Sequence, residues 1–271
     1  MATLLAGVDF SSSPSRKKPI TVAIGRLVDG GRVLRVGGLA ELFTLDAFAA
    51  WLQTPGPWLG AFDFPFGLPR RFVDGNALGS TAAEVITEVH RRAPTRMAWR
   101  ALIDAWGNTQ PAGARLLHRR TDVASPVGST SPLQTRYVPV GLMYYEGVAR
   151  LVSSGVSMPG LHAGDDWRVA LEGYPRRSAH AIVGRRSYKN EDNDDRREAR
   201  EVIVATLEGG TGSAPRLSTD DRTLRASLVA DASGDRLDAV LCLVQAAVAS
   251  RLVRHGVPED VDPVEGWIVA T

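Results

Sequence analysis

The sequence predicts an α/β fold, and three patterns lead to that prediction. Residues 20–28 and 32–39 are β-rich runs joined by an Asp-Gly-Gly turn, as in a hairpin. Residues 58–69 form a continuous apolar run, which is typical of a strand buried on both faces. Residues 233–253 carry the strongest helical pattern of the chain. We therefore expect a sheet covered by helices.

The N-terminal third predicts the order strand, strand, strand, helix, strand. Residues 3–10 are a short apolar run that contains Asp9, and they precede the hairpin. Residues 44–53 have helical spacing of their apolar side chains, with Thr44 as the N-cap. Because a helix joins the third and fourth strands, we expect strands one to three to be antiparallel. The fourth strand should pair parallel with the first, on its far side.

Residues 70–160 differ in character and are expected to form a helical and looped insertion. From residue 70 to 150 they hold 11 Arg and no Lys against 6 acidic residues. Helices are expected near 83–106 and 141–154, separated by breaks rich in Ser, Gly and Pro. We expect this insertion to overhang the carboxyl end of the sheet, within a single domain that spans 1–271.

The α/β pattern returns after the insertion. Residues 167–175 predict a strand that ends near Glu172, and a helix follows from Pro175. Residues 194–208 predict an exposed amphipathic helix. Ser233 is the expected N-cap of the last helix, and the closing EGWIVA is expected to be an edge strand or a tail.

Composition narrows the class of protein. The 271 residues are 44% hydrophobic and 23% charged, as in globular proteins, and a net charge of +2 excludes a histone-like polycation. The single Cys242 excludes an intramolecular disulfide and a cysteine-rich zinc site. The longest apolar stretch, 237–249, is too short and too polar to span a bilayer. With no basic segment of the signal-peptide type near the start, we expect a cytoplasmic protein without membrane partners.

Carboxylates stand at the ends of predicted strands and at the start of the last helix. The candidates are Asp9, Asp63, Glu172, Asp235 and Asp238. Burying carboxylates together is unfavourable unless a cation compensates their charge. Oxygen ligands favour Mg²⁺ or Mn²⁺. The pattern therefore predicts a divalent metal site.

Each of these acids also has a structural interpretation. Asp9 precedes three serines and suits a turn, and Asp63 suits a strand end where it accepts backbone hydrogen bonds. Asp235 and Asp238 suit the positive end of a helix dipole. Glu172 suits an edge strand. Only their convergence in space distinguishes a site from these separate roles.

Five motifs occur in order along the chain: GVDF (7–10), FDFPFGLP (62–69), EGYP (172–175), SYK (187–189) and GDRLDAVLCL (234–243). The placing of their acids on the predicted strands and the last helix resembles the RNase H-like nuclease superfamily, with a layout similar to that of Holliday-junction resolvases. More narrowly, the motifs resemble the domain-of-unknown-function family four-two-nine, whose members are predicted RNase H-like nucleases. The resemblance implies a mixed five-stranded sheet flanked by helices.

The resemblance also implies a site with two metal ions about 4 Å apart that cleaves phosphodiesters. Asp9 would bridge both ions, Asp63 and Asp238 would hold one each, and Asp235 would bind directly or through water. Glu172 is a further candidate catalytic residue.

Nucleic acid requires a cationic path to such a site. The candidate substrate-binding residues are Arg70, Arg71, Arg119, Arg120 and Lys189. Solvated surface positions are the alternative for each of them.

The expected function is therefore that of a metal-dependent nuclease acting on DNA or RNA. An actin-like or sugar-kinase-like phosphotransferase is an alternative, because GVDFSSS (7–13) also resembles the first strand of those enzymes. The other alternative is a non-catalytic nucleic-acid-binding module of the same fold. The geometry of Asp9, Asp63 and Asp238 separates these readings, because a metal site requires their carboxylates to meet.

Overall fold

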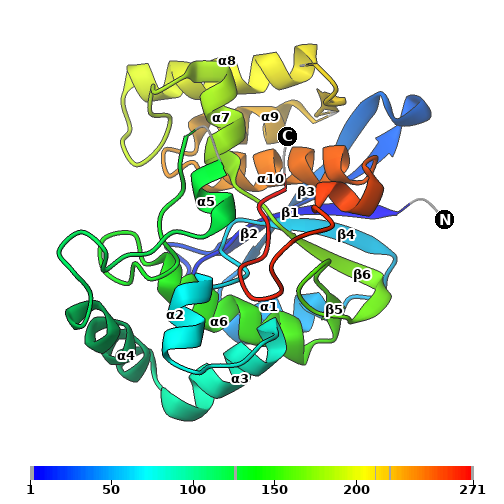
Figure 1. Cartoon of the computed structure of the whole chain (residues 1–271). Coiled ribbons are helices and arrows are strands. Elements are labelled where there is room, and N and C mark those ends of the chain that lie inside the picture. Colours follow the sequence, from blue (N-terminus) through cyan, green and yellow to red (C-terminus); the bar gives the residue numbers. More distant parts are fainter. Residues whose placement is uncertain (1–2, 125–126, 211, 220, 270–271) are drawn as a thin grey trace.

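The computed structural model describes residues 3–124, 127–210, 212–219 and 221–269. A twisted mixed sheet forms the middle layer, and helices cover both of its faces (Figure 1). The strands, in chain order, are β1 Leu4–Asp9, β2 Ile20–Val28, β3 Val33–Leu42, β4 Trp58–Phe62, β5 Val156–Ser157, β6 Asp165–Glu172 and β7 Arg216–Ser218.

The sheet has the order β5-β6-β4-β1-β2-β3-β7. β2 is antiparallel to β1 and β3, and β4 pairs parallel with β1 on the opposite side, as predicted. The sheet has seven strands where the sequence predicted five. The two additional strands, β5 and β7, are two and three residues long and lie at the edges, so they leave no periodic pattern in the sequence.

The α-helices of the described residues are α1 Leu45–Leu52, α2 Arg70–Gly75, α3 Ala82–Arg92, α4 Arg96–Asn108, α5 Arg120–Ala124, α6 Val140–Ser153, α7 Pro175–Val183, α8 Asp194–Gly209, α9 Arg222–Ala230 and α10 Asp235–Ala249. Thr44 caps α1 as expected, since its hydroxyl accepts from the Ala47 amide at 3.0 Å. None of these helices is long and apolar enough to cross a membrane.

Three local predictions need correction. The helix expected over 83–106 is two helices, because Pro94 interrupts it and Thr95 caps the second. The strand expected over 58–69 ends at Phe62, because the segment that follows contains Pro65 and Pro69 and leaves the sheet. Gly234 stands at the N-cap of α10 in place of Ser233, whose hydroxyl donates to Asp231 instead.

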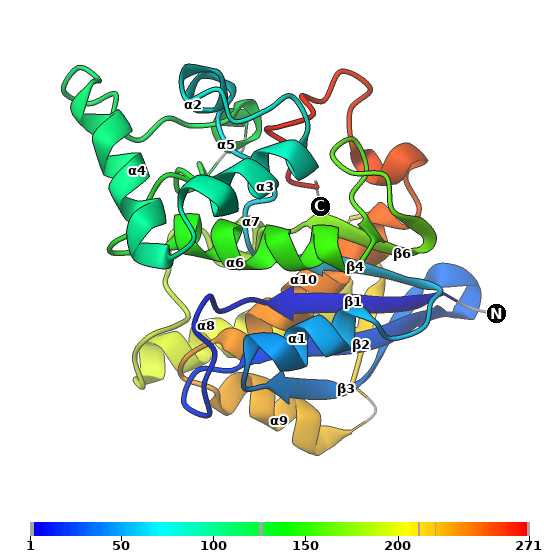
Figure 2. The same ribbon diagram turned by 90° about the horizontal axis from the view of Figure 1, so that it is seen from below.

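Alternating side chains of the central strands separate two cores. On one face α1 and α6 pack on an aromatic cluster that includes Phe48, Phe62 and Phe64. On the other face α10 lies along β1 and β2, with α7, α8 and α9 around it (Figure 2). The insertion, which contributes α2 to α6, packs on the α1 face. Its contacts from Arg96 and Arg119 also reach the carboxyl end of the sheet, so it overhangs that end only in part.

Gly7 sets the distance between β1 and α10. A Cβ placed on Gly7 would lie 2.1 Å from the carbonyl oxygen of Ala239 and from the amide nitrogen of Leu243. No real Cβ makes such contacts with backbone, so the helix can approach this strand only over a glycine. This approach brings the first turn of α10 beside the end of β1.

We predict that Gly7→Ala destabilises the fold by about 3 kcal/mol, because α10 must move away from β1. Gly209→Ala is the matched control, since a Cβ there meets nothing within 4 Å. It should leave the free energy of unfolding unchanged or raise it by up to about 1 kcal/mol. Urea unfolding of both variants measures the difference. Equal stability of the two variants would show that the α10 contact adjusts without cost.

Candidate metal centre

Three of the predicted carboxylates meet at the carboxyl end of the central strands. Asp9 is the last residue of β1, and Asp63 follows the last residue of β4. The two strands are adjacent and parallel, and the Asp63 amide continues their pairing by donating to the carbonyl of Val8 at 2.8 Å. Asp238 lies in the first turn of α10. One carboxylate oxygen from each residue lies within 4.8 Å of the other two.

Burial and the charges of neighbouring acids disfavour the ionised forms of Asp9 and Asp63. Asp238 is fully buried, Asp9 is 8% exposed and Asp63 is half-buried. Burial, followed by the charge of Asp238, raises the pKa of Asp9 well above its ordinary value. The same two causes raise the pKa of Asp63 to about 7. The negative charge of this cluster is therefore poorly compensated by nearby positive charge at neutral pH.

Two neighbouring residues of one loop contact Asp238. The hydroxyl of Tyr188 donates to Oδ1, and the ammonium of Lys189 donates to Oδ2. Burial lowers the pKa of Lys189, but the charges of Asp238 and Asp63 outweigh that effect and raise it above its usual range. Lys189 is therefore a charged partner of the cluster, and its side chain remains 34% exposed.

Asp235 lies close to the cluster without joining it. Its charge is one of the causes that raise the pKa of Asp9, so the two carboxylates interact. Burial raises the pKa of Asp235 itself, while Lys18 opposes that rise. The structure therefore brings Asp9, Asp63 and Asp238 together and leaves Asp235 at their margin.

Glu172, predicted as a catalytic candidate, is engaged elsewhere. Both of its carboxylate oxygens accept from the guanidinium of Arg119, at 2.6 and 2.8 Å, and the Phe66 amide donates to the same group at 2.9 Å. Arg119 also binds Asp122 through two nitrogens. All three charged side chains are buried. The charge of Glu172 acts on Asp63, but its oxygens belong to a structural ion pair.

Three of the four arginines predicted to bind substrate hold the C-terminal segment instead, which we define as residues 257–269. Arg70 forms a two-nitrogen ion pair with Asp262, and Arg120 pairs with Asp260. Arg119, which is 2% exposed, donates to the carbonyl of Glu265. The Glu265 carboxylate accepts from the backbone amides that begin α2 and α5. A phosphate-binding role is therefore excluded for the buried Arg119, and Arg70 and Arg120 are committed to acids of their own chain.

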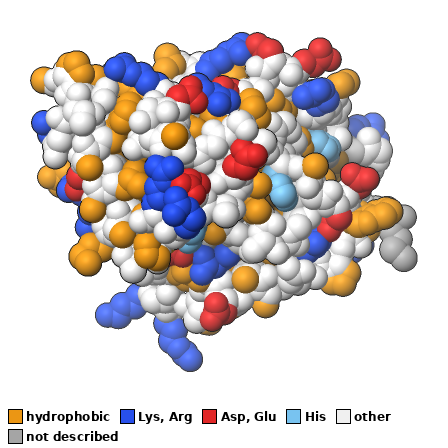
Figure 3. Space-filling view, turned by 60° about the horizontal axis from the view of Figure 1, so that its bottom comes forward, with side chains coloured by type: hydrophobic (Ala, Val, Ile, Leu, Met, Phe, Trp, Pro, Cys, Tyr) orange, Lys and Arg blue, Asp and Glu red, His pale blue; other side chains and the backbone are white. Residues whose placement is uncertain are grey.

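The arginine surplus of the insertion is largely paired in the same way. Arg71 donates to Gln110. Other arginines pair with an acid of their own helix, namely Arg91 and Arg92 with Glu88 and Arg150 with Glu146, and Arg136 pairs with Asp104 of α4. Basic and acidic side chains are correspondingly interspersed over one face of the molecule (Figure 3). The excess of arginine in residues 70–150 therefore reflects ion pairs within the protein as much as an exposed basic surface.

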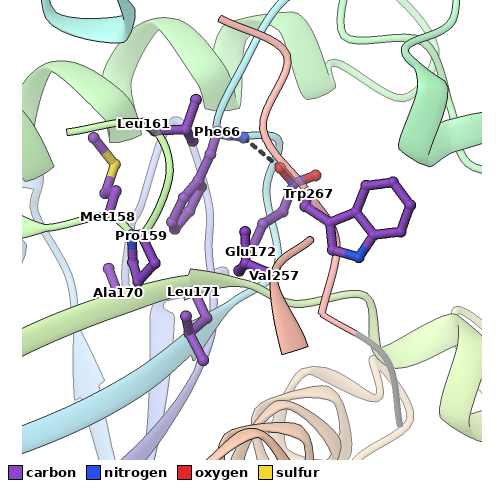
Figure 4. Close-up of a pocket in the computed structure, with 9 residues that line it drawn as sticks. All are labelled: Phe66, Met158, Pro159, Leu161, Ala170, Leu171, Glu172, Val257 and Trp267. Atoms are coloured by element: carbon purple, nitrogen blue, oxygen red, sulfur yellow. Dashed lines mark hydrogen bonds between the residues drawn. The ribbon is translucent and has the colours of Figure 1, made fainter. Parts of the chain in front are cut away.

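The hollow beside Glu172 is too small for a substrate. Phe66 and Leu161 line it together with Trp267 of the C-terminal segment, and the Glu172 carboxylate points toward the Phe66 amide (Figure 4). Its volume is about 10 Å³, which is the space of a single water. Of the residues in the carboxylate cluster, Asp63 and Lys189 are partly exposed to solvent, while Asp238 is fully buried.

Two contributors to this site are not among the residues expected from the sequence. Tyr188 gives no separate signal, although it stands beside Lys189 in the motif SYK. Lys18 lies in the loop after β1, and its charge acts on Asp235. The basic run RKK (16–18), in the loop that follows the Asp9 strand, is the sequence signal that points to it.

Comparison of the chain with protein-family models, with curated proteins and with solved structures finds no match in any of the three. The chemistry of the site therefore rests on its own geometry. That geometry consists of three converging carboxylates, one lysine and one tyrosine.

We predict that, without divalent metal, the protein loses stability as the pH rises from about 4 to about 7. Asp63 has a higher pKa in the folded state than in the unfolded chain, so the folded state binds its proton more tightly. The stabilisation is present below the unfolded pKa and is lost as the pH rises through the folded value.

Asp63→Asn removes this titrating group, so the free energy of unfolding should change less with pH between about 4 and 7. Relative to wild type, we expect the variant to gain roughly 2 kcal/mol between pH 4 and 7.5. Urea unfolding in EDTA at several pH values provides the measurement. Parallel profiles for the two proteins would contradict the shifted pKa.

We predict that Glu172→Gln destabilises the fold by about 3 kcal/mol, because it leaves the buried Arg119 guanidinium with one carboxylate in place of two. It should leave the response of the melting temperature to Mn²⁺ unchanged. Thermal melts with and without Mn²⁺ measure both effects. Loss of the Mn²⁺ response in a folded Glu172→Gln protein would show that Glu172 is a metal ligand after all.

Proposed function

We propose that this protein is a metal-dependent nuclease whose metal ligands are Asp9, Asp63 and Asp238. The observation that carries the proposal is the convergence of their carboxylate oxygens within 4.8 Å. The separate structural roles of a turn, a strand end and a helix dipole require no such convergence. A non-catalytic module would not need it either.

The donor chemistry fits Mg²⁺ or Mn²⁺. All three groups are hard oxygen donors, the type that these ions prefer over the nitrogen and sulfur ligands of zinc. The cluster is buried, and Lys189 supplies a single positive charge against three carboxylates. A divalent ion would supply the missing charge and remove the repulsion that raises the pKa of Asp9 and Asp63.

Bound divalent ions would activate a water and stabilise the leaving oxygen of a phosphodiester. Asp235 lies near enough for its charge to act on Asp9. As in the resembled family, Asp9 would therefore serve two ions, with Asp235 as a ligand of the second. Asp238 is fixed by Tyr188 and by the first turn of α10. Lys18 and Lys189 are the cations next to these acids, and they would meet the negative charge of a nucleic-acid backbone.

The sheet supports an RNase H-like core as part of this proposal. The antiparallel meander of β1, β2 and β3 and the parallel β4 beside β1 are the arrangement that the sequence motifs predicted. Together with β6 they make the five longer strands of the sheet, and β5 and β7 extend its edges. The proposed site lies at the carboxyl ends of β1 and β4, against the late helix, as the resemblance implies.

We predict that Mn²⁺ at ten times its Kd stabilises the wild-type protein by roughly 1.4 kcal/mol and raises its melting temperature by about 3 °C. Asp9→Asn and Asp238→Asn should abolish this rise. Asp9→Asn also removes one repelling charge, so the metal-free variant should be at least as stable as wild type. Asp166→Asn, a change at an exposed aspartate, is the matched control and should keep the rise.

Cleavage of single-stranded, duplex, hybrid and branched nucleic acids in Mn²⁺ tests the activity itself. We expect the wild type and Asp166→Asn to cleave at least one substrate class and Asp9→Asn to cleave none. A metal response without cleavage of any substrate would support a binding module. If Mn²⁺ still raises the melting temperature of both Asp9→Asn and Asp238→Asn, these residues are not the metal ligands.

A further inference from the structure

Lysine is rare in this chain, and one of the few lysines lies in the carboxylate cluster. Among the 32 basic residues only Lys17, Lys18 and Lys189 are lysines. Lys17 and Lys18 stand in the exposed loop after β1, whereas Lys189 contacts the buried Asp238. Arginine makes the structural ion pairs described above. The basic residue in contact with the cluster is therefore a lysine, whose charge is compact and whose side chain is flexible.

The backbone on both sides of Lys189 is held firmly. Arg200 donates to the carbonyls of Tyr188 and Val229, at 2.8 and 2.7 Å, and Arg196 donates to the carbonyl of Lys189 itself. Gly234 permits close packing, since a Cβ there would lie 2.7 Å from the Cβ of Lys189. The loop therefore fixes the base of the Lys189 side chain beside α10, while about a third of the side chain as a whole is exposed to solvent.

The ammonium of Lys189 and a divalent ion would compete for the same oxygens. Lys189 binds Oδ2 of Asp238, Tyr188 occupies Oδ1, and the charges of Asp63 and Asp9 also act on the ammonium. An ion shared by the three carboxylates would come into contact range of that ammonium, and like charges repel at such distances. The side chain can avoid this repulsion because its stem is flexible and about a third of it faces solvent.

We propose that Lys189 is a tethered counter-ion: it neutralises the cluster in the metal-free protein, and a divalent ion displaces it toward solvent. This inference rests on the metal site of the proposed function and adds the role of Lys189 to it. In the exchange one positive charge leaves Asp238 and two arrive. The displaced ammonium then lies at the rim of the site, where a phosphate of a nucleic acid would meet it.

A titration with Mn²⁺ alone tests the exchange without any substrate. The electron paramagnetic resonance signal of free Mn²⁺ gives the Kd of the intact protein. We expect Lys189→Met to bind Mn²⁺ more tightly by on the order of tenfold, because the competing cation is gone. Its metal-free melting temperature should fall, because the carboxylates lose their counter-ion. Lys17→Met makes the same change of charge at an exposed site and should bind as wild type does.

The outcomes separate this inference from the proposed function. Tighter binding by Lys189→Met alone supports the exchange. Equal binding by wild type and both variants overturns the exchange and leaves the metal site in place. Weaker binding by Lys189→Met also overturns it, since Lys189 would then assist the ion. No binding by any of the three proteins overturns the metal site and the exchange together.

A second measurement uses the wild-type chain and does not depend on the folding of a variant. Reductive methylation followed by mass spectrometry reports how reactive each lysine amine is, and the exposed Lys17 serves as the internal reference. We expect Mn²⁺ to increase the methylation of Lys189 by several-fold relative to Lys17. Unchanged or reduced methylation of Lys189 at saturating Mn²⁺ would overturn the displacement.

Discussion

Three carboxylates share one buried position at the ends of β1 and β4, and their charge constrains what surrounds them. Such an arrangement is unfavourable unless cations or protons compensate it. The raised pKa of Asp9 and Asp63 and the direct contact of Lys189 with Asp238 are both responses to this charge. In the proposed function, a bound divalent ion would relieve the repulsion that folding imposes on these carboxylates.

The packing of α10 on β1 creates that position. The contact over Gly7 brings the first turn of the helix to the end of the strand, and the buried, largely apolar body of the helix holds it there. Gly234, at the start of the same helix, leaves space for Lys189. The same secondary elements thus place the acids and their counter-ion.

A second set of charges holds the opposite flank of the site. The buried Arg119 joins Glu172 and Asp122, while Arg70 and Arg120 bind acids of the C-terminal segment. Glu265 caps the first turns of two short helices of the insertion. Arginines that the sequence suggested as substrate-binding residues therefore connect distant parts of the chain. The basic residues next to the carboxylate cluster are lysines.

The sequence by itself determined the order of the main strands and helices, because hydrophobic period, turn residues and caps such as Thr44 are local signals. It also identified Asp9, Asp63 and Asp238, since an acid within or beside an apolar segment is visible without a structure. Only the tertiary structure shows which of the acids converge and which are held in ion pairs. Glu172 and Asp63 occupy similar places in the pattern, yet the partner of Glu172 is Arg119, 53 residues away along the chain. Ion pairs across such separations depend on how the chain folds back, and no local pattern records that.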